Sequence, residues 1–342
     1  MSLIQPSRAF LAPDHGSGQG ELSYLRTAPR HLVDRSAIAD VLITDWQRTG
    51  ADTFFLGAQW PRGHAFYAPI AGTWYDPLLA AESLRQASLL VGQTYYGIPR
   101  GHQWIIGELD IEVAPAALLL GSRPAEIRLE VARSPDPDSA PGAGAGAGAE
   151  PDSGAGAGAA TVMTVEAELL RDDDAFVGAG RISLDVLSPA AYARLRGDRL
   201  GPPSGLPRLP EALPPPVVGR LDVRDVVLGV PAARSGRGGH TWQLRVDPSH
   251  PALFDHPVDH VPAMLLLEAA RQAAQAVCAP YRVLPIEVRS AFHHPVELDI
   301  ACHIAATPLP QQDAAEDTAV RVTASQNGTL VFDSLVVAAL CD

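Results

Sequence analysis

The chain has 342 residues, of which 46% are hydrophobic, and a formal net charge of −13 at pH 7. This length and composition predict about two domains with substantial cores, and the acidic balance argues against a nucleic-acid partner because no broad basic surface is available to neutralise phosphates. All 26 basic residues are arginines, which excludes Schiff-base chemistry and a Walker-type phosphate loop because both require lysine.

The three cysteines, Cys278, Cys302 and Cys341, are scattered and form neither a disulfide framework nor a metal-binding pattern. A reducing, cytoplasmic location is therefore expected. The N-terminal segment lacks the basic and apolar regions of a signal peptide, and no uninterrupted apolar run of about 18 residues could span a membrane. We expect no cofactor and no bound metal ion.

A flexible tail is predicted at residues 1–28, followed by a first domain at 29–187. A strand-like run ends the segment 31–43, and an apolar helix is predicted over 76–91. Further strands are predicted from aromatic content or from apolar and polar alternation, at 52–59, 103–113, 126–132, 161–169 and 180–186.

A low-complexity segment rich in glycine and alanine occupies residues 134–160. Its glycines recur at every second position, which does not match the G-x-G-x-x-G spacing of a dinucleotide site. We interpret the segment as a disordered insertion in a hairpin.

A Pro-rich, semi-rigid linker is predicted at 188–216, before a second domain at 217–342. In this domain, residues 255–275 predict a polar loop followed by a largely apolar helix, with Pro262 in the first helical turn.

Near the C-terminus, the pair Asn327-Gly328 predicts a tight hairpin between strands at 320–324 and 330–339. Each half then contains one long apolar helix and several antiparallel strands. This predicts an α+β fold in which a sheet wraps a central helix. A parallel βαβ domain would need several helices in each half.

One polar stripe crosses the second helix, because Glu268, Arg271, Gln272 and Gln275 fall on a single face. A buried charge without a partner costs several kcal/mol, so the stripe needs an explanation. An offset of 186 residues reproduces the Glu, the Arg and the first Gln of this stripe in the first helix. It aligns Glu82 with Glu268, Arg85 with Arg271, Gln86 with Gln272, His64 with His250, Tyr95 with Tyr281 and Pro99 with Pro285. With small insertions the match extends to Arg35 with Arg220, 40–42 with 225–227, and 108–111 with 297–300. The chain is therefore interpreted as a tandem duplication.

Three motifs and the duplication together resemble the A-factor biosynthesis family, the γ-butyrolactone-type autoregulator synthases. The motifs are WPRGH at 60–64, ESLRQ at 82–86 and HPVDHVPAMLLLEAARQAA at 256–274. The resemblance implies two fused hot-dog folds. It also implies an acyltransferase that condenses a β-ketoacyl group, delivered on acyl carrier protein, with dihydroxyacetone phosphate (DHAP). The product would be a β-ketoacyl-DHAP ester, a precursor of a butyrolactone, butenolide or furan signal.

The loop and helix at 255–275 are also similar to the hot-dog dehydratases of fatty-acid synthesis. Pro262, Ala263 and Glu268 fit that pattern, but Phe254 stands where the pattern places its catalytic histidine, and His256 lies two residues away. A dehydratase or thioesterase acting on acyl carrier protein is one alternative. A non-catalytic protein that binds an acyl chain or a signal molecule is another.

The implied reaction needs a base, donors for an oxyanion and cations for a phosphate. Glu82 with Arg271 is the first candidate catalytic pair, and Glu268 with Arg85 is its counterpart across the two halves. Gln86 and Gln272 would orient ester or phosphate oxygens. In the alternative interpretation, Glu82–Arg85 and Glu268–Arg271 are structural i, i+3 ion pairs.

Histidines His64, His250 and His256 are candidate substrate-binding residues. His64 and His250 share one repeat position, so both could instead pin a loop to the backbone. His256 and His260 have no histidine counterpart in the first half, which suggests that only one of the two sites is active. A metal site is disfavoured because the histidine spacing lacks H-E-x-x-H or cysteine partners.

The arginines and tryptophans suggest where a carrier protein and an acyl chain would bind. Docking of an acidic carrier protein would need a local arginine cluster, and the candidates are Arg26, Arg30 and Arg35; Arg220 and Arg224; or Arg282 and Arg289. Four tryptophans are expected either in the core or in the lining of an acyl tunnel, namely Trp60, Trp74, Trp104 and Trp242. We expect a monomer built as a pseudo-dimer of hot dogs, with a homodimer as the alternative.

Overall fold

The computed structural model describes residues 21–134, 161–230, 240–310 and 317–341. Residues 135–160 of the predicted insertion lie outside this described part. The first half contains β1 (Ile43–Arg48), β2 (Thr53–Trp60), α1 (Leu78–Tyr95), β3 (Gln103–Val113), β4 (Ala125–Ser134), β5 (Thr161–Arg171) and β6 (Phe176–Leu187). A short helix, α2 (Pro189–Arg196), follows β6 in the predicted linker.

The second half repeats this order of elements with shorter first strands. It contains β7 (Leu228–Gly229), β8 (His240–Leu244), α3 (Ala263–Cys278), β9 (Val283–Phe292), β10 (Cys302–Pro308), β11 (Thr318–Gln326) and β12 (Thr329–Leu340). The duplication extends to short 3-10 helices, since Arg30–Leu32 and Ile38–Asp40 precede β1 as Pro215–Val218 and Val223–Asp225 precede β7. The remaining 3-10 helices are Pro115–Leu118 and Gly197–Arg199.

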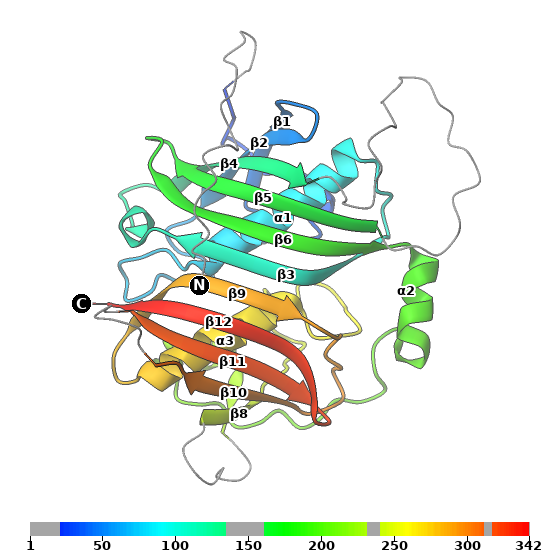
Figure 1. Ribbon diagram of the computed structural model, residues 1–342, viewed down its shortest axis with the longest axis vertical. Helices are drawn as coiled ribbons and strands as arrows, with labels where there is room; N and C mark the ends of the chain where they lie inside the picture. Colours follow the sequence, from blue (N-terminus) through cyan, green and yellow to red (C-terminus); the bar gives the residue numbers. More distant parts are fainter. Residues whose placement is uncertain (1–20, 135–160, 231–239, 311–316, 342) are drawn as a thin grey trace.

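All twelve strands of the described residues belong to one sheet, in the order β1-β2-β4-β5-β6-β3-β9-β12-β11-β10-β8-β7. The halves join where β3 pairs antiparallel with β9, with Asp110 opposite Arg289. The Ser290 N–H donates to Asp110 Oδ1 at 3.2 Å across this seam. Figure 1 shows the sheet running without interruption through both halves.

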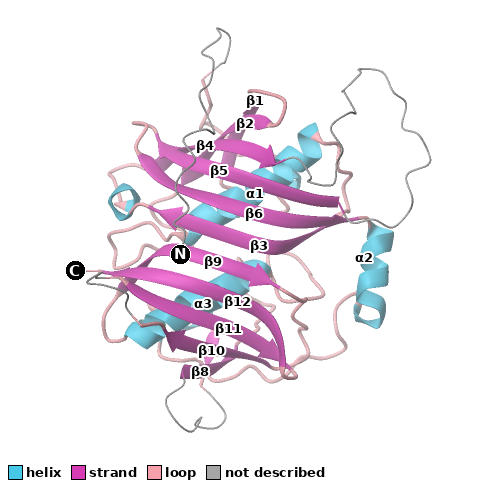
Figure 2. Ribbon diagram, viewed as in Figure 1, coloured by secondary structure: helices cyan, strands magenta, loops and turns pink. Residues whose placement is uncertain are grey.

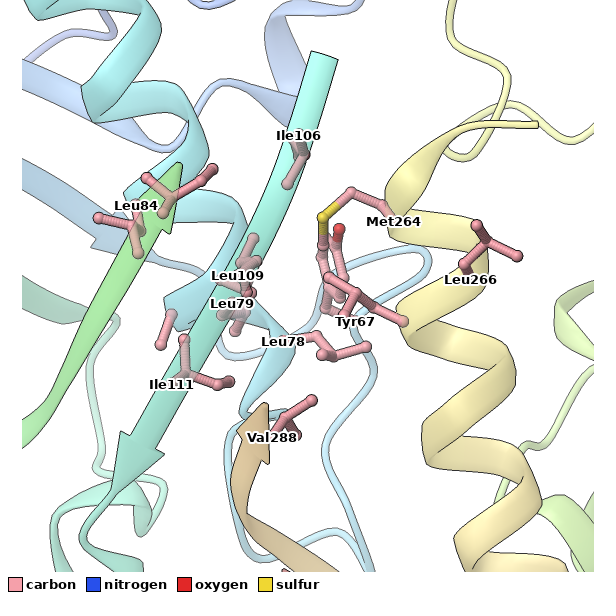
Figure 3. Close-up of a cluster of buried hydrophobic side chains, with 14 of the residues drawn as sticks. Tyr67, Leu78, Leu79, Leu84, Ile106, Leu109, Ile111, Met264, Leu266 and Val288 are labelled. Carbon is pink, nitrogen blue, oxygen red and sulfur yellow. The ribbon is translucent and has the colours of Figure 1, made fainter. Parts of the chain in front are cut away.

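Helices α1 and α3 lie on the same face of this sheet, one under each half, whereas α2 lies beyond the strand ends, next to the end of β6 (Figure 2). Both long helices are apolar on most sides and are buried along most of their length. Gly180 on β6 permits the close approach of α1, because a Cβ there would lie 2.9 Å from Leu84 Cδ2. One continuous apolar core connects the halves, and Figure 3 shows part of it between α1, β3 and α3.

The predicted tandem hot-dog architecture is confirmed, with one long helix against an antiparallel sheet in each half. The Asn327-Gly328 hairpin is also confirmed, with φ of 50° and 80° at the two turn residues. Pro262 precedes the helix as its N-cap rather than lying in the first turn. The domain boundaries at 29–187 and 217–342 stay predictions.

One detail of the repeat alignment is wrong. Residues 108–111 lie in β3, but 297–300 follow β9 and lie outside any strand. The pairing of β3 with β9 identifies β9 as the structural counterpart of β3. Short sequence identity misled the alignment here because strand residues are constrained mainly by alternation.

Candidate active site

The polar stripe of α1 forms a buried ionic cluster around Glu82. Arg85 donates to this carboxylate from Nε at 3.0 Å and from Nη2 at 2.9 Å. Arg35, which precedes the first strand, donates from Nε at 3.0 Å, and Gln86 donates from Nε2 at 2.6 Å. Burial raises the pKa of the Glu82 carboxyl, but the charges and hydrogen bonds of the two arginines outweigh burial and lower it to about 2. Glu82 is therefore a permanent anion with both oxygens occupied.

Glu268 on α3 is held in the same way. Arg271 donates from Nε and Nη2 at 2.8 Å each. Arg220 donates from Nε at 2.8 Å and from Nη2 at 2.6 Å. Burial is again outweighed by the two arginines, so the pKa of Glu268 is lowered to about 2. Each carboxylate thus pairs with two arginines of its own half, and the described residues form no ion pair between Glu82 and Arg271 or between Glu268 and Arg85.

The two glutamines hold the segments that precede β1 and β7. Gln86 Oε1 accepts from the Leu42 N–H at 2.9 Å, and its Nε2 donates to the Asp40 carbonyl at 2.7 Å. Gln272 makes the equivalent bonds to the Val227 N–H at 2.9 Å and the Asp225 carbonyl at 2.6 Å. Each amide also donates to the carboxylate of its own cluster, Gln86 to Glu82 and Gln272 to Glu268.

His64 and His250 cap the loops that lead into the two helices. His64 Nδ1 accepts from the N–H groups of Phe66 and Tyr67 at 3.1 and 3.2 Å. His250 Nδ1 accepts from the N–H groups two and three residues further along at 3.3 and 3.1 Å. Nε2 of each ring lies near an aspartate, Asp40 at 3.4 Å and Asp225 at 3.1 Å. Each histidine thus holds the backbone of its own loop through two hydrogen bonds, which matches the alternative role of pinning the loop.

A cavity of about 1160 Å3 lies between the two halves. The first half contributes Arg35 and Arg85, the second contributes the loop 252–264, and α2 contributes Tyr192. Trp104 and Ile106 at the start of β3 and Met264 and Leu266 on α3 form an apolar part of its wall. Figure 3 shows Met264 extending from the start of α3 toward Tyr67 and β3. The cavity therefore mixes residues of both halves, as expected.

Of the predicted site residues, Arg85 and His256 line this cavity. Glu82 does not line the cavity but lies behind Arg35 and Arg85, which line it and donate to the Glu82 carboxylate. Outside the lining lie Glu268, Arg271, Gln86, Gln272, His64 and His250. The catalytic and binding roles assigned to all of these residues stay predictions.

Arg35 was not among the predicted site residues. Its match to Arg220 in the repeat was the available signal, but both arginines were grouped with candidate docking residues. Their side chains are only 9% and 3% exposed, so neither belongs to a docking surface. Among the tryptophans, Trp104 lines the cavity, whereas Trp60 and Trp242 are core residues.

Contacts between the halves build the cavity wall beside Arg35. Its Nη1 donates to the Ala252 carbonyl at 3.3 Å. Asp255 accepts from the Ala37 N–H at 2.9 Å and also bonds the neighbouring N–H of Ser36. Asp34, in the left-handed region at φ 52°, lies 3.8 Å from His256 Nε2. The two loops therefore form one continuous surface around the arginines.

The equivalent space beside Arg220 is filled. Arg220 Nη1 donates to the Phe66 carbonyl at 2.6 Å, and the Phe66 ring lies 4.6 Å from its Cζ. Fully buried Asp76 lies 3.5 Å from Arg220 Nη2, and its Oδ1 accepts from the Leu78 N–H at the start of α1. In contrast, α3 begins at the cavity wall with no side-chain cap.

Two general features of the described ranges bear on function. No group of three or more histidine, cysteine or acidic side chains in them is arranged to hold a metal ion. None of the helices in the same ranges combines the length and the apolar character needed to cross a membrane.

Comparison with known proteins identifies the class of protein that this fold and site define. The family model of the A-factor biosynthesis hotdog domain matches residues 19–145 and 203–341. The chain belongs to this family, which confirms the resemblance seen in the sequence.

Curated relatives of similar length carry one name, 2-oxo-3-(phosphooxy)propyl 3-oxoalkanoate synthase. The protein of Streptomyces virginiae is 41% identical over 310 residues, covering 91% of this chain and 97% of that protein. The protein of Streptomyces griseus subsp. griseus is 38% identical over 334 residues, covering 97% and 98%. The protein of Streptomyces coelicolor is 37% identical over 304 residues, covering 89% of each.

Proposed function

We propose that this protein is an acyltransferase that joins a 3-oxoacyl group to dihydroxyacetone phosphate. The product named in its relatives is a 3-oxo acid esterified to the hydroxyl of DHAP. The donor would be a 3-oxoacyl thioester on acyl carrier protein. The DHAP hydroxyl attacks the thioester carbonyl, and the carrier thiol leaves. The ester would be the precursor of a γ-butyrolactone-type signalling molecule.

The observation that carries this proposal is the placement of Arg35 and Arg85 at the wall of the large cavity. Two guanidinium groups share one carboxylate there, so the cluster has a net charge of +1. Among the described residues, Arg85 Nη1 has no hydrogen-bond partner, which leaves N–H groups for a phosphate. Arginine suits a phosphate because its planar fork donates two parallel hydrogen bonds, and the chain has no lysine.

Glu82 would act as a fixed anion that orients the two arginines. A carboxyl with a pKa of about 2 and two occupied oxygens is a weak base, since a general base works best with a pKa near the working pH. Glu268 and Arg271 would play the matching structural part in the second half, away from the substrates.

The rest of the cavity offers what the acyl group needs. The N-terminus of α3 opens at Pro262 and Ala263, and its partial positive charge would stabilise the oxyanion formed from the thioester carbonyl. The apolar wall of Trp104, Ile106 and Met264 would hold the acyl chain. Together with the arginine cluster, this arrangement places a polar and an apolar substrate in one space.

The direct test is to incubate the protein with a 3-oxoacyl carrier protein and DHAP and to identify the products by mass. The expected result is the phosphorylated ester, with little ester from dihydroxyacetone, which lacks the phosphate. Formation of an enoyl thioester or a free acid would instead identify a dehydratase or a thioesterase. Unchanged substrate would favour a binding protein.

Arg85→Ala sharpens this test because it removes the cation while leaving the acyl site intact. Hydrogen bonds to charged groups contribute about 1.5–3 kcal/mol each, so kcat/KM for DHAP should fall about 100-fold. The matched variant Arg271→Ala, assayed as folded protein, should retain most activity. If Arg271→Ala loses the ester and Arg85→Ala keeps it, the assignment of the active half is wrong.

A further inference from the structure

A histidine and an aspartate that the proposed function does not use stand together at the cavity wall. His260 Nδ1 lies 2.8 Å from Asp259 Oδ1, in the loop just before α3. The His260 side chain is 25% exposed and lines the cavity, whereas Asp259 is 9% exposed behind it. Such a pair resembles the histidine base and the orienting carboxylate of enzymes that activate a hydroxyl nucleophile.

Helix α2 holds the aspartate in its ionised form. The Tyr192 hydroxyl donates to Asp259 Oδ1 at 2.6 Å, and Arg196 Nε donates to Oδ2 at 3.1 Å. Arg196 is itself buried and donates to both Glu297 oxygens at 2.8 Å. Burial raises the pKa of the Asp259 carboxyl, but the hydrogen bonds and charges of His260, Tyr192 and Arg196 outweigh it and hold that pKa well below its ordinary value.

The tautomer of His260 follows from these contacts. Burial, reinforced by the neighbouring Asp259, raises the pKa of the Tyr192 phenol, so the phenol keeps its proton and donates it. His260 Nδ1 also lies 3.2 Å from the Tyr192 hydroxyl, whose proton is already donated to Asp259. Ionised Asp259 can only accept hydrogen bonds, so in the neutral imidazole the proton facing Asp259 sits on Nδ1. The lone pair then lies on Nε2, which forms no hydrogen bond with any described residue.

We propose that His260 is the general base of ester formation, oriented by Asp259 and Tyr192. This inference rests on the proposed function. Nε2 takes the proton of the DHAP hydroxyl as its oxygen bonds to the thioester carbonyl carbon, and the carbonyl electron pair moves onto oxygen. When the C=O bond reforms, the C–S bond breaks. The proton passes from Nε2 to the departing thiolate, which regenerates neutral His260.

Two other histidines at the cavity wall, His256 and His293, lack this geometry. His256 lies 3.8 and 3.9 Å from Asp34 and Asp255, beyond hydrogen-bond distance. His293 pairs through Nε2 with Asp333 at 2.9 Å, so that atom is occupied. The repeat positions that match Asp259 and His260 are Thr73 and Trp74. The pair is therefore unique to the half whose helix opens on the cavity.

The test compares His260→Ala with the unmodified full chain in the ester assay. General-base catalysis contributes about 10²- to 10⁴-fold, so kcat should fall by that factor while KM for DHAP changes little. Added imidazole should restore part of the rate, since it can occupy the vacated space. Asp259→Asn should also lower kcat, because an amide can favour the other tautomer. His303→Gln, an exposed histidine on β10, is the control and should keep full activity.

Three outcomes distinguish this inference from the proposed function. If the unmodified protein forms the ester and His260→Ala forms it equally fast, the base assignment is overturned and the function stands. A folded His260→Ala variant that loses activity and is not rescued by imidazole also overturns it. If the unmodified protein forms no ester, the function fails and the inference fails with it. Should His260→Ala fail to fold, His260→Gln replaces it, and an active His260→Gln would overturn the assignment.

Discussion

The Glu82 and Glu268 clusters make nearly the same hydrogen bonds, but different residues pack above them. In the Glu268 cluster, Arg220 donates to the Phe66 carbonyl. In the Glu82 cluster, the equivalent Arg35 donates to the Ala252 carbonyl. Phe66 and Ala252 are 186 positions apart and so occupy one repeat position. The phenyl ring covers Arg220, whereas the methyl group leaves Arg35 at the cavity wall.

The ionic cluster is alike in the two halves, whereas the residues packed above it differ. A buried carboxylate needs compensating charges in either half, because leaving one uncompensated costs several kcal/mol. The residues above the cluster have no such constraint. One half therefore keeps a filled version of the cluster, and the other keeps a version that is open to the cavity.

The largest expected difference between the clusters is in stability. Glu268→Gln removes the anion shared by Arg220 and Arg271, each 3% exposed, and leaves only Asp76, 3.5 Å from Arg220, as a buried counter-charge. We expect the free energy of unfolding to fall by about 3–5 kcal/mol. Glu82→Gln should cost about 1–3 kcal/mol, because Arg85 is 13% exposed at the cavity and can be solvated. Denaturant titration of both variants checks this, and a larger loss for Glu82→Gln would contradict the comparison.

Exchange of the two covering residues tests the cause of the difference. Phe66→Ala should lower the free energy of unfolding by about 3–5 kcal/mol, since a fully packed ring is lost, and should leave ester formation in the cavity between the halves intact. Ala252→Phe places a ring over Arg35 and should abolish ester formation. Its thermal unfolding should stay close to that of the unmodified chain. Retained activity in a folded Ala252→Phe variant would show that this position does not control access.

Much of the fold was predictable because it depends on local patterns. Alternation of apolar and polar residues predicted β3 to the residue, and the stripe from Glu268 to Gln275 predicted α3. The strands β9 and β10 were not predicted. Pro285 interrupts the apolar and polar alternation of β9, and Pro308 ends that of β10. β9 forms a strand despite its proline because it pairs on one side with β3 and on the other with β12.

The site was less predictable because its partners come from distant segments. Arg35 and Arg220 reach their carboxylates from 47 and 48 residues away, so helix spacing could not reveal them. Spacing did reveal Glu82 with Arg85. It could not decide whether the arginines pair within a half or across the two halves, since that depends on the tertiary position of each loop.

Acid should weaken both clusters to the same degree despite their different exposure. Both carboxyls have a pKa lowered from 4.5 to about 2 in the folded chain, so between these values the unfolded chain binds more protons. Their contribution is fully present above about pH 5 and is lost as the pH falls toward 2. From pH 5 to pH 3 we expect a loss of about 2 kcal/mol per group.

Denaturant titration at pH 5 and pH 3 measures this loss. Glu82→Gln and Glu268→Gln should each reduce the difference between the two pH values, and by similar amounts. A flatter response for only one variant would show that the other carboxyl does not titrate as its surroundings predict.

The smallest expected effect concerns the acyl chain and returns to the open half. Trp104 lines the cavity and packs on α1 at Gly92, where a Cβ would lie 2.4 Å from the ring. Trp104→Ala enlarges the apolar wall, so the ratio of kcat/KM for longer over shorter 3-oxoacyl donors should rise. Gly92→Ala forces the ring away from α1 and should lower that ratio. Each change should be about 10- to 200-fold, the range of 1–3 kcal/mol for a methylene group in an apolar pocket. Trp242→Phe, in the core of the second half, is the control and should leave chain-length preference unchanged. If all three variants prefer the same donor, the acyl chain does not lie against Trp104, and the apolar wall of the cavity must serve another part of the substrate.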